Sequence, residues 1–182
     1  MDAVEAFNTL PAERLEPELL ACCAAPAWGA AILASRPFAD RAALLAGAEA
    51  TGRDLSWAEV LAGLSAHPRI GERAAGDSAE AAWSRAEQSA AAQSADDRTG
   101  AELIAANREY EERFGHVFLI FASGRSQAEI LAAARERLGN DETTERAIVT
   151  GELSRIARLR LERVLAGLEP APGAMERVPD AL

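Results

Sequence analysis

The stretch "VTGELSRIARLRLERVL", residues 149–165, decides the fold class. Its core-facing positions recur at steps of four, three, four and four residues, which is the spacing of one face of an α-helix. These positions are Val149, Leu153, Ile156, Arg160 and Val164. The pattern predicts the longest helix of the chain, beginning at Asn140 or Asp141 and ending at about Gly167.

One residue of this stripe is unexpected, because Arg160 falls where an apolar side chain should face the core. A buried arginine is costly unless a counter-charge meets it. Its head could reach solvent or bridge to an acidic residue, which would be a purely structural role. Alternatively, it could bind an anionic ligand inside the protein.

Composition supports an all-α fold over the whole chain. Of the 182 residues, 49% are hydrophobic but only 5% are aromatic, and alanine and leucine dominate. This mixture favours helices over sheets. We expect a single compact domain of about eight or nine helices over residues 1–168, followed by a flexible C-terminal tail over 169–182.

Capping and turn signals divide the chain into helix-sized segments. Serine and glutamate three residues apart form two capping boxes, Ser56 with Glu59 and Ser126 with Glu129. The predicted helices span 37–52, 56–67, 78–92 (capped by Asp77), 96–113 (with Gly115 after its end) and 126–139, with short helices starting at Pro11, Pro17 and Pro26. Residues 69–77 are expected to form a loop. The apolar run 116–124 resembles a strand, or else a buried helical turn.

Charge and motif content exclude several functions. The formal net charge is −10, and phosphate-backbone binding needs basic patches, so we expect no nucleic-acid partner. We expect no membrane segment, no metal and no cofactor, since apolar runs are short and phosphate loops, dinucleotide fingerprints and zinc spacings are missing from the sequence. Adjacent Cys22 and Cys23 predict reduced, buried thiols. We expect a cytoplasmic protein.

Two sequence features are candidates for chemistry. His67 precedes Pro68 at the predicted end of a helix, and is either a structural histidine or a proton carrier. Ser84, Glu87 and Gln88 share a helix face and could bind a small polar ligand, although a solvated face has the same spacing. His116 is assigned no role.

Four blocks of sequence give these candidates a context. "AHPRIG" at 66–71, "SRAEQ" at 84–88, "FGHVFLIFASGRS" at 114–126 and "RIARLRL" at 155–161 stand in order. With them the chain resembles the 2-oxo-4-hydroxy-4-carboxy-5-ureidoimidazoline (OHCU) decarboxylases of urate breakdown over roughly residues 5–167. One departure is the run 89–93, where relatives often have a glycine-leucine pair.

The resemblance implies a cofactor-free, all-helical and commonly dimeric enzyme that makes (S)-allantoin and carbon dioxide from the ureidoimidazoline. It implies His67 as the catalytic acid/base, with Glu87 either orienting the imidazole or binding the substrate. It places Arg160 at the substrate carboxylate. The other substrate-binding residues that it implies are Pro68, Ser84, Gln88, Phe118, Leu119, Ile120, Phe121 and Ala122.

The resemblance also implies a homodimer and coupling to urate oxidase and hydroxyisourate hydrolase, the two enzymes that precede this step. Two other readings of the residues stay open. One is a helical binding module for allantoin or a related ureide that has no catalytic activity. The other is a helical scaffold without a pocket, in which replacing Arg160 would stabilise the protein or have no effect.

Overall fold

The expected all-α class is confirmed by the computed structural model, which describes residues 2–71, 78–94 and 96–169. These residues contain ten helices and no strand. The helices are α1 (Ala3–Thr9), α2 (Ala12–Cys22), α3 (Pro26–Ala34), α4 (Arg41–Arg53), α5 (Trp57–Leu64), α6 (Ala79–Glu87), α7 (Ser89–Gln93), α8 (Asp97–Phe114), α9 (Gln127–Arg137) and α10 (Glu142–Leu168). The expected tail lies outside the described residues, apart from Glu169, which accepts a hydrogen bond from Arg41.

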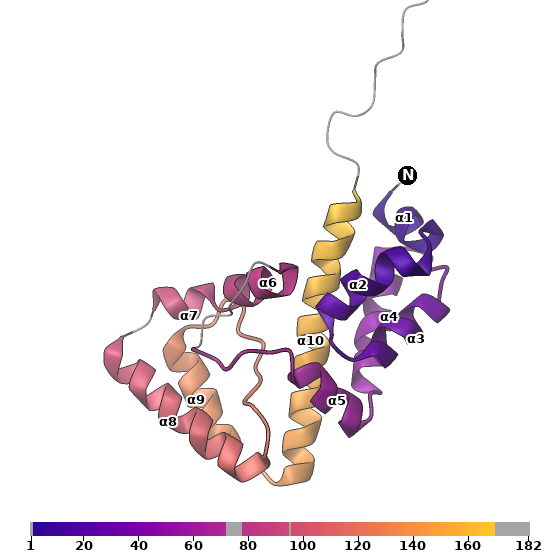
Figure 1. Cartoon of the computed structure of the whole chain (residues 1–182). Helices are drawn as coiled ribbons and strands as arrows, with labels where there is room; N and C mark the ends of the chain where they lie inside the picture. Colours follow the sequence, from indigo (N-terminus) through magenta and orange to yellow (C-terminus); the bar gives the residue numbers. More distant parts are fainter. Residues whose placement is uncertain (1, 72–77, 95, 170–182) are drawn as a thin grey trace, which may run out of the picture.

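Helix α10 is the central element of the fold. Helices α1–α5 lie on one side of it and α6–α9 on the other (Figure 1). Buried residues form one apolar cluster between α1–α5 and α10, and a second cluster centred on α8 and α9. Helix α4 packs closely on α10 at Gly52, where an added Cβ would lie 2.7 Å from the Ser154 hydroxyl oxygen. Glycine is therefore required at this crossing.

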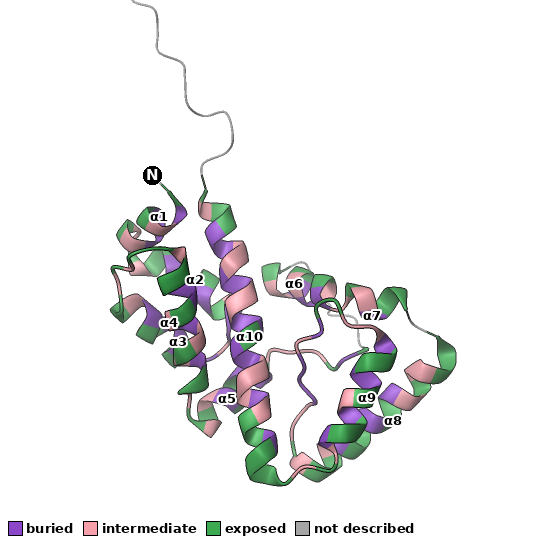
Figure 2. Ribbon diagram, turned by 180° about the vertical axis from the view of Figure 1, so that it is seen from behind, coloured by how far each residue is buried: buried purple, intermediate pink, exposed green. Residues whose placement is uncertain are grey.

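The apolar run 116–124 is neither a strand with a partner nor a helical turn. It is an extended segment that passes between α9 and α10 (Figure 1), and Figure 2 shows much of it as buried. Val117, Leu119 and Phe121 pack against the first cluster, whereas Phe118, Ile120 and Ala122 belong to the second. Because side chains alternate between two cores, the sequence has the periodicity of a strand without a sheet.

Several predicted boundaries were correct because they depend on local capping. Both capping boxes are present, Asp96 and Asp141 cap α8 and α10, and Gly115 ends α8 with a left-handed φ of 76°. Ser78 caps α6; the predicted cap Asp77 and most of the loop 69–77 lie outside the described residues.

Four predicted boundaries were wrong. Helix α5 ends at Leu64, with Ser65 as its C-cap, rather than at His67. Helix α4 begins at Arg41 rather than at Pro37, because Asp40 caps it and the Phe38 backbone is bound by the distant Asn8 side chain. Pro17 lies inside α2, whose buried face continues through it, rather than starting a helix. The segment 78–92 divides into α6 and α7 at Gln88, whose φ and ψ are −92° and 3°. The Gln88 side chain accepts a hydrogen bond from Gly71, a residue that local sequence does not place there.

Candidate active site

The fold gathers most of the expected site residues around one small cavity of about 20 Å³. Nine of the eleven line it: His67, Pro68, Ser84, Glu87, Gln88, Leu119, Ile120, Ala122 and Arg160. Phe118 and Phe121 are not among the lining residues, since Phe118 packs under Arg137 and Phe121 under Arg155. Ile70 and Ile156 line the cavity and were missed by sequence reasoning, because isolated isoleucines give no functional signal.

The imidazole of His67 is held by the end of α5. Its Nδ1 lies 3.0 Å from the carbonyl oxygen of Gly63. A carbonyl only accepts hydrogen bonds, so Nδ1 carries the proton and donates it. The other ring nitrogen, Nε2, is buried and has no hydrogen-bond partner in the described part of the chain. The neutral ring therefore offers a free basic lone pair.

Burial also controls the charge of this ring. Burial and, to a smaller extent, the positive charge of Arg160 lower the pKa of His67 from its ordinary value near 6.5 to about 4, although the hydrogen bond to Gly63 opposes the shift. At neutral pH the imidazole is consequently uncharged and ready to accept a proton.

We expect an NMR titration of the His67 ring to show a midpoint near pH 4. The His67→Asn variant, which lacks this resonance, assigns the signal and separates it from that of His116. If neutral His67 is the working form, kcat/KM should be constant from pH 5 to 8 and fall only as pH approaches 4, where the ring becomes protonated. A midpoint near 6.5 would contradict the burial of the ring.

Arg160 occupies the core position that made it unusual in the sequence. It is 1% exposed, and its guanidinium makes two hydrogen bonds of 3.0 Å to the carboxylate of Glu87 and one of 3.0 Å to the Ser84 hydroxyl. Arg163 binds the same carboxylate at 2.8 Å. The acidic bridge expected as the structural alternative is thus present.

The helix face on α6 is not solvated, because Ser84 and Glu87 are both buried against α10. Glu87 bonds to Arg160 and Arg163, and the group seen to orient His67 is the Gly63 carbonyl. Sequence reasoning missed Arg163, although its position three residues after Arg160 was a usable signal.

Burial has the opposite effect on the two cysteines near this site. It raises the pKa of both the Cys22 and the Cys23 thiol, so that they remain protonated and poorly nucleophilic. Both are free and buried, as expected.

Among the described residues, no group of three or more histidine, cysteine or acidic side chains is placed to hold a metal ion. No helix in the described ranges is both long and apolar enough to cross a membrane.

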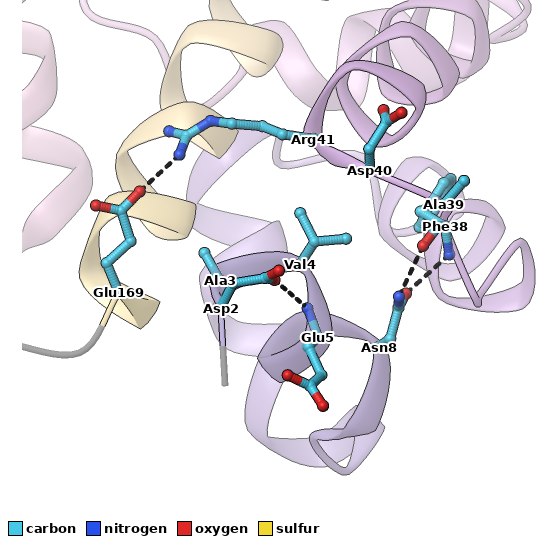
Figure 3. Close-up of a pocket in the computed structure, with 10 residues that line it drawn as sticks. All are labelled: Asp2, Ala3, Val4, Glu5, Asn8, Phe38, Ala39, Asp40, Arg41 and Glu169. Atoms are coloured by element: carbon cyan, nitrogen blue, oxygen red, sulfur yellow. Dashed lines mark hydrogen bonds and ion pairs between the residues drawn. The ribbon is translucent and has the colours of Figure 1, made fainter.

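A much larger hollow of about 760 Å³ lies elsewhere, between α1, the start of α4 and Glu169 (Figure 3). Most of its polar side chains already serve the fold. Asp2 and Asp40 cap helices, Asn8 bonds to the Phe38 backbone, and Arg41 pairs with Glu169. Despite its size, this hollow offers no cluster of free reactive groups.

Fold and cavity together define an all-helical protein with a small buried polar site, in which a histidine nitrogen without a partner among the described residues lies beside an arginine–glutamate pair. A family model described as OHCU decarboxylase matches residues 8–162. The chain belongs to the OHCU decarboxylase family.

Individual relatives agree with this membership. The chain is 33% identical over 141 residues to the 2-oxo-4-hydroxy-4-carboxy-5-ureidoimidazoline decarboxylase of Amia calva, covering 77% of this chain and 81% of that protein. It is 30% identical over 153 residues to the uric acid degradation bifunctional protein TTL of Arabidopsis thaliana, covering 83% of this chain but only 47% of the relative. The chain therefore spans less than half of that longer protein.

A solved structure shows the same fold. The crystal structure of an OHCU decarboxylase in the presence of (S)-allantoin superposes with a TM-score of 0.71 at 28% identity, covering 83% of this chain and 99% of that one.

Proposed function

We propose that this protein decarboxylates OHCU to (S)-allantoin and carbon dioxide without a cofactor. Family membership supports the reaction, and one structural observation carries it. The unpartnered Nε2 of neutral His67 and the buried guanidinium of Arg160 belong to residues that line the same cavity.

The substrate contains its own electron sink. Its carboxylate is attached next to the carbon of a C=N bond, so the electron pair released with carbon dioxide moves to the ring nitrogen, which takes a proton from solvent. The resulting enol then loses its hydroxyl proton and gains one on the neighbouring ring carbon. Neutral His67 can accept the hydroxyl proton of the enol and deliver it to one face of the neighbouring ring carbon, which gives a single enantiomer.

The second partner of Glu87 explains how Arg160 could serve a substrate. A cavity of about 20 Å³ holds about one water molecule, so binding the substrate requires the lining to separate. If Arg160 turns toward the substrate carboxylate, Glu87 still has Arg163 at 2.8 Å and is not left as an isolated buried charge. The Arg160–Glu87 ion pair thus keeps a guanidinium inside the protein that can bind an anionic ligand.

The remaining proposed contacts are polar and shape-determining. The Ser84 hydroxyl and the Gln88 amide can bond to the ureido group or the ring, and Pro68 fixes the chain beside His67. Leu119, Ile120 and Ala122 supply the wall against which the ring lies.

The assembly and cellular setting belong to the same proposal. We infer a homodimer that acts in the cytoplasm, together with urate oxidase and hydroxyisourate hydrolase. The family resemblance supports the dimer, and the name of the Arabidopsis relative, a bifunctional protein of uric acid degradation, supports coupling between steps.

The decisive assay forms the unstable substrate in the cuvette from urate with urate oxidase and hydroxyisourate hydrolase. Added protein should produce a rapidly growing circular dichroism signal of (S)-allantoin. If the assay showed nothing but the slow decay to racemic allantoin, without a circular dichroism signal, the proposal would be contradicted. Binding of (S)-allantoin without turnover would identify the chain as a binding module instead.

A further inference from the structure

The wall of the cavity is fastened to the rest of the protein at two backbone atoms. The carbonyl oxygen of Leu119 accepts a hydrogen bond of 2.7 Å from Arg137, and the N–H of Phe121 donates one of 2.5 Å to the carboxylate of Glu152. Neither Arg137 nor Glu152 is among the residues that line the cavity. Both therefore hold the wall from outside the cavity.

These two bonds fix the direction in which the backbone N–H and carbonyl of Ile120 point. In an extended chain, the backbone polar groups of successive residues point to opposite edges. The Leu119 carbonyl and the Phe121 N–H occupy one edge, so the N–H and carbonyl of Ile120 point to the other. Ile120 lines the cavity, as do Leu119 and Ala122.

The carboxylate of Glu152 is itself held firmly. Its other oxygen lies 3.1 Å from the guanidinium of Arg155, one turn further along α10. That guanidinium stacks over the Phe121 ring at 4.7 Å, and the Glu152 side chain is only 14% exposed. Phe121, Glu152 and Arg155 thus contact one another in a closed ring of interactions. The ionised carboxylate of Glu152 strengthens its hydrogen bond to the Phe121 N–H.

We propose that Glu152 is a positioning residue that, through Phe121, turns the backbone polar groups of Ile120 toward the substrate ring. This inference rests on the proposed decarboxylase function. The substrate carries ring and ureido groups that both donate and accept hydrogen bonds, so a wall of fixed direction determines which ring face meets His67. Glu152 thereby controls substrate affinity and the enantiomer formed, although it touches neither the substrate nor the imidazole.

The test compares substitutions at Glu152 in the substrate-forming assay. Glu152→Ala removes the acceptor and should lower kcat/KM by on the order of 10–100-fold, mainly through KM, and lower the enantiomeric excess of the allantoin. Glu152→Gln keeps an oxygen that can accept from Phe121 and should recover most of both quantities. Glu142→Gln, which removes an exposed carboxylate paired with Arg146 on the same helix, is the matched control and should behave as the unsubstituted protein.

A purely structural role would give a different result. In that case Glu152→Ala would lower the melting temperature but leave KM and enantiomeric excess unchanged at a temperature where the variant is folded, and this would overturn the inference. The amide resonance of Phe121 supplies a readout apart from activity: it should shift strongly in Glu152→Ala, and an unshifted resonance would also overturn it. If the unsubstituted protein formed no (S)-allantoin, the proposed function itself would fail, and this inference with it.

Discussion

His67→Asn is expected to lower the rate of (S)-allantoin formation by about 10²–10⁴-fold, the usual contribution of a positioned acid or base. Asparagine retains an N–H that can donate to the Gly63 carbonyl, which now holds the imidazole at 3.0 Å. It has no group that exchanges protons near neutral pH. The substitution therefore removes proton transfer while disturbing the surrounding fold little. The rise of the circular dichroism signal measures the effect.

The second histidine provides the control. His116 contacts the rings of Trp57, Tyr110 and Phe114 and is not among the residues lining the cavity. His116→Gln should therefore keep its activity within a few-fold of that of the unsubstituted protein. Retention of nearly full activity by His67→Asn would show that the proton comes from another group.

Arg160→Met is expected to cost about 3–5 kcal/mol in the free energy of unfolding and to abolish activity. The methionine fills part of the buried volume, but Glu87 and Ser84 each lose a charged partner. Since Arg163 still binds Glu87, the cost should lie toward the lower end of that range. Urea unfolding measures the stability, and the substrate-forming assay measures the activity.

A double variant separates stability from function. In Arg160→Met with Glu87→Leu, no carboxylate remains buried at this site, and replacing an ion pair by apolar side chains is often neutral or stabilising. The double variant should regain most of the lost stability but remain inactive, because nothing then binds the substrate carboxylate. An active double variant would assign the pair a structural role only and would show that Arg160 does not bind the substrate carboxylate.

Local sequence was sufficient for most helices and for the all-α class. The stripe in 149–165 predicted α10 because helical periodicity is a property of neighbouring residues. Ser56, Ser126 and Gly115 marked helix ends because a cap bonds within three or four residues of itself. The site candidates His67, Glu87 and Arg160 were also found in the sequence, partly from the burial expected of Arg160 and partly from resemblance to a family.

Partners distant in the chain could not be found in this way. The sequence left open whether Arg160 meets solvent, an acid or a ligand; the packing of α6 against α10 brings it to Glu87, 73 residues away. The strand-like run 116–124 does not pair in a sheet, because it lies between two apolar clusters formed by helices. The helix predicted over 78–92 breaks at Gln88, whose side chain accepts a hydrogen bond from the distant Gly71.

The sequence by itself thus determined the helices, their capped ends and the residue types available for chemistry, since these depend on interactions within a few residues. Only the tertiary structure decided the surroundings of those residues. It buried the His67 ring beside Arg160, which lowers the pKa of the imidazole to about 4 and leaves Nε2 without a partner. Burial and charge at a point in space depend on every element packed there, and no local pattern contains that information.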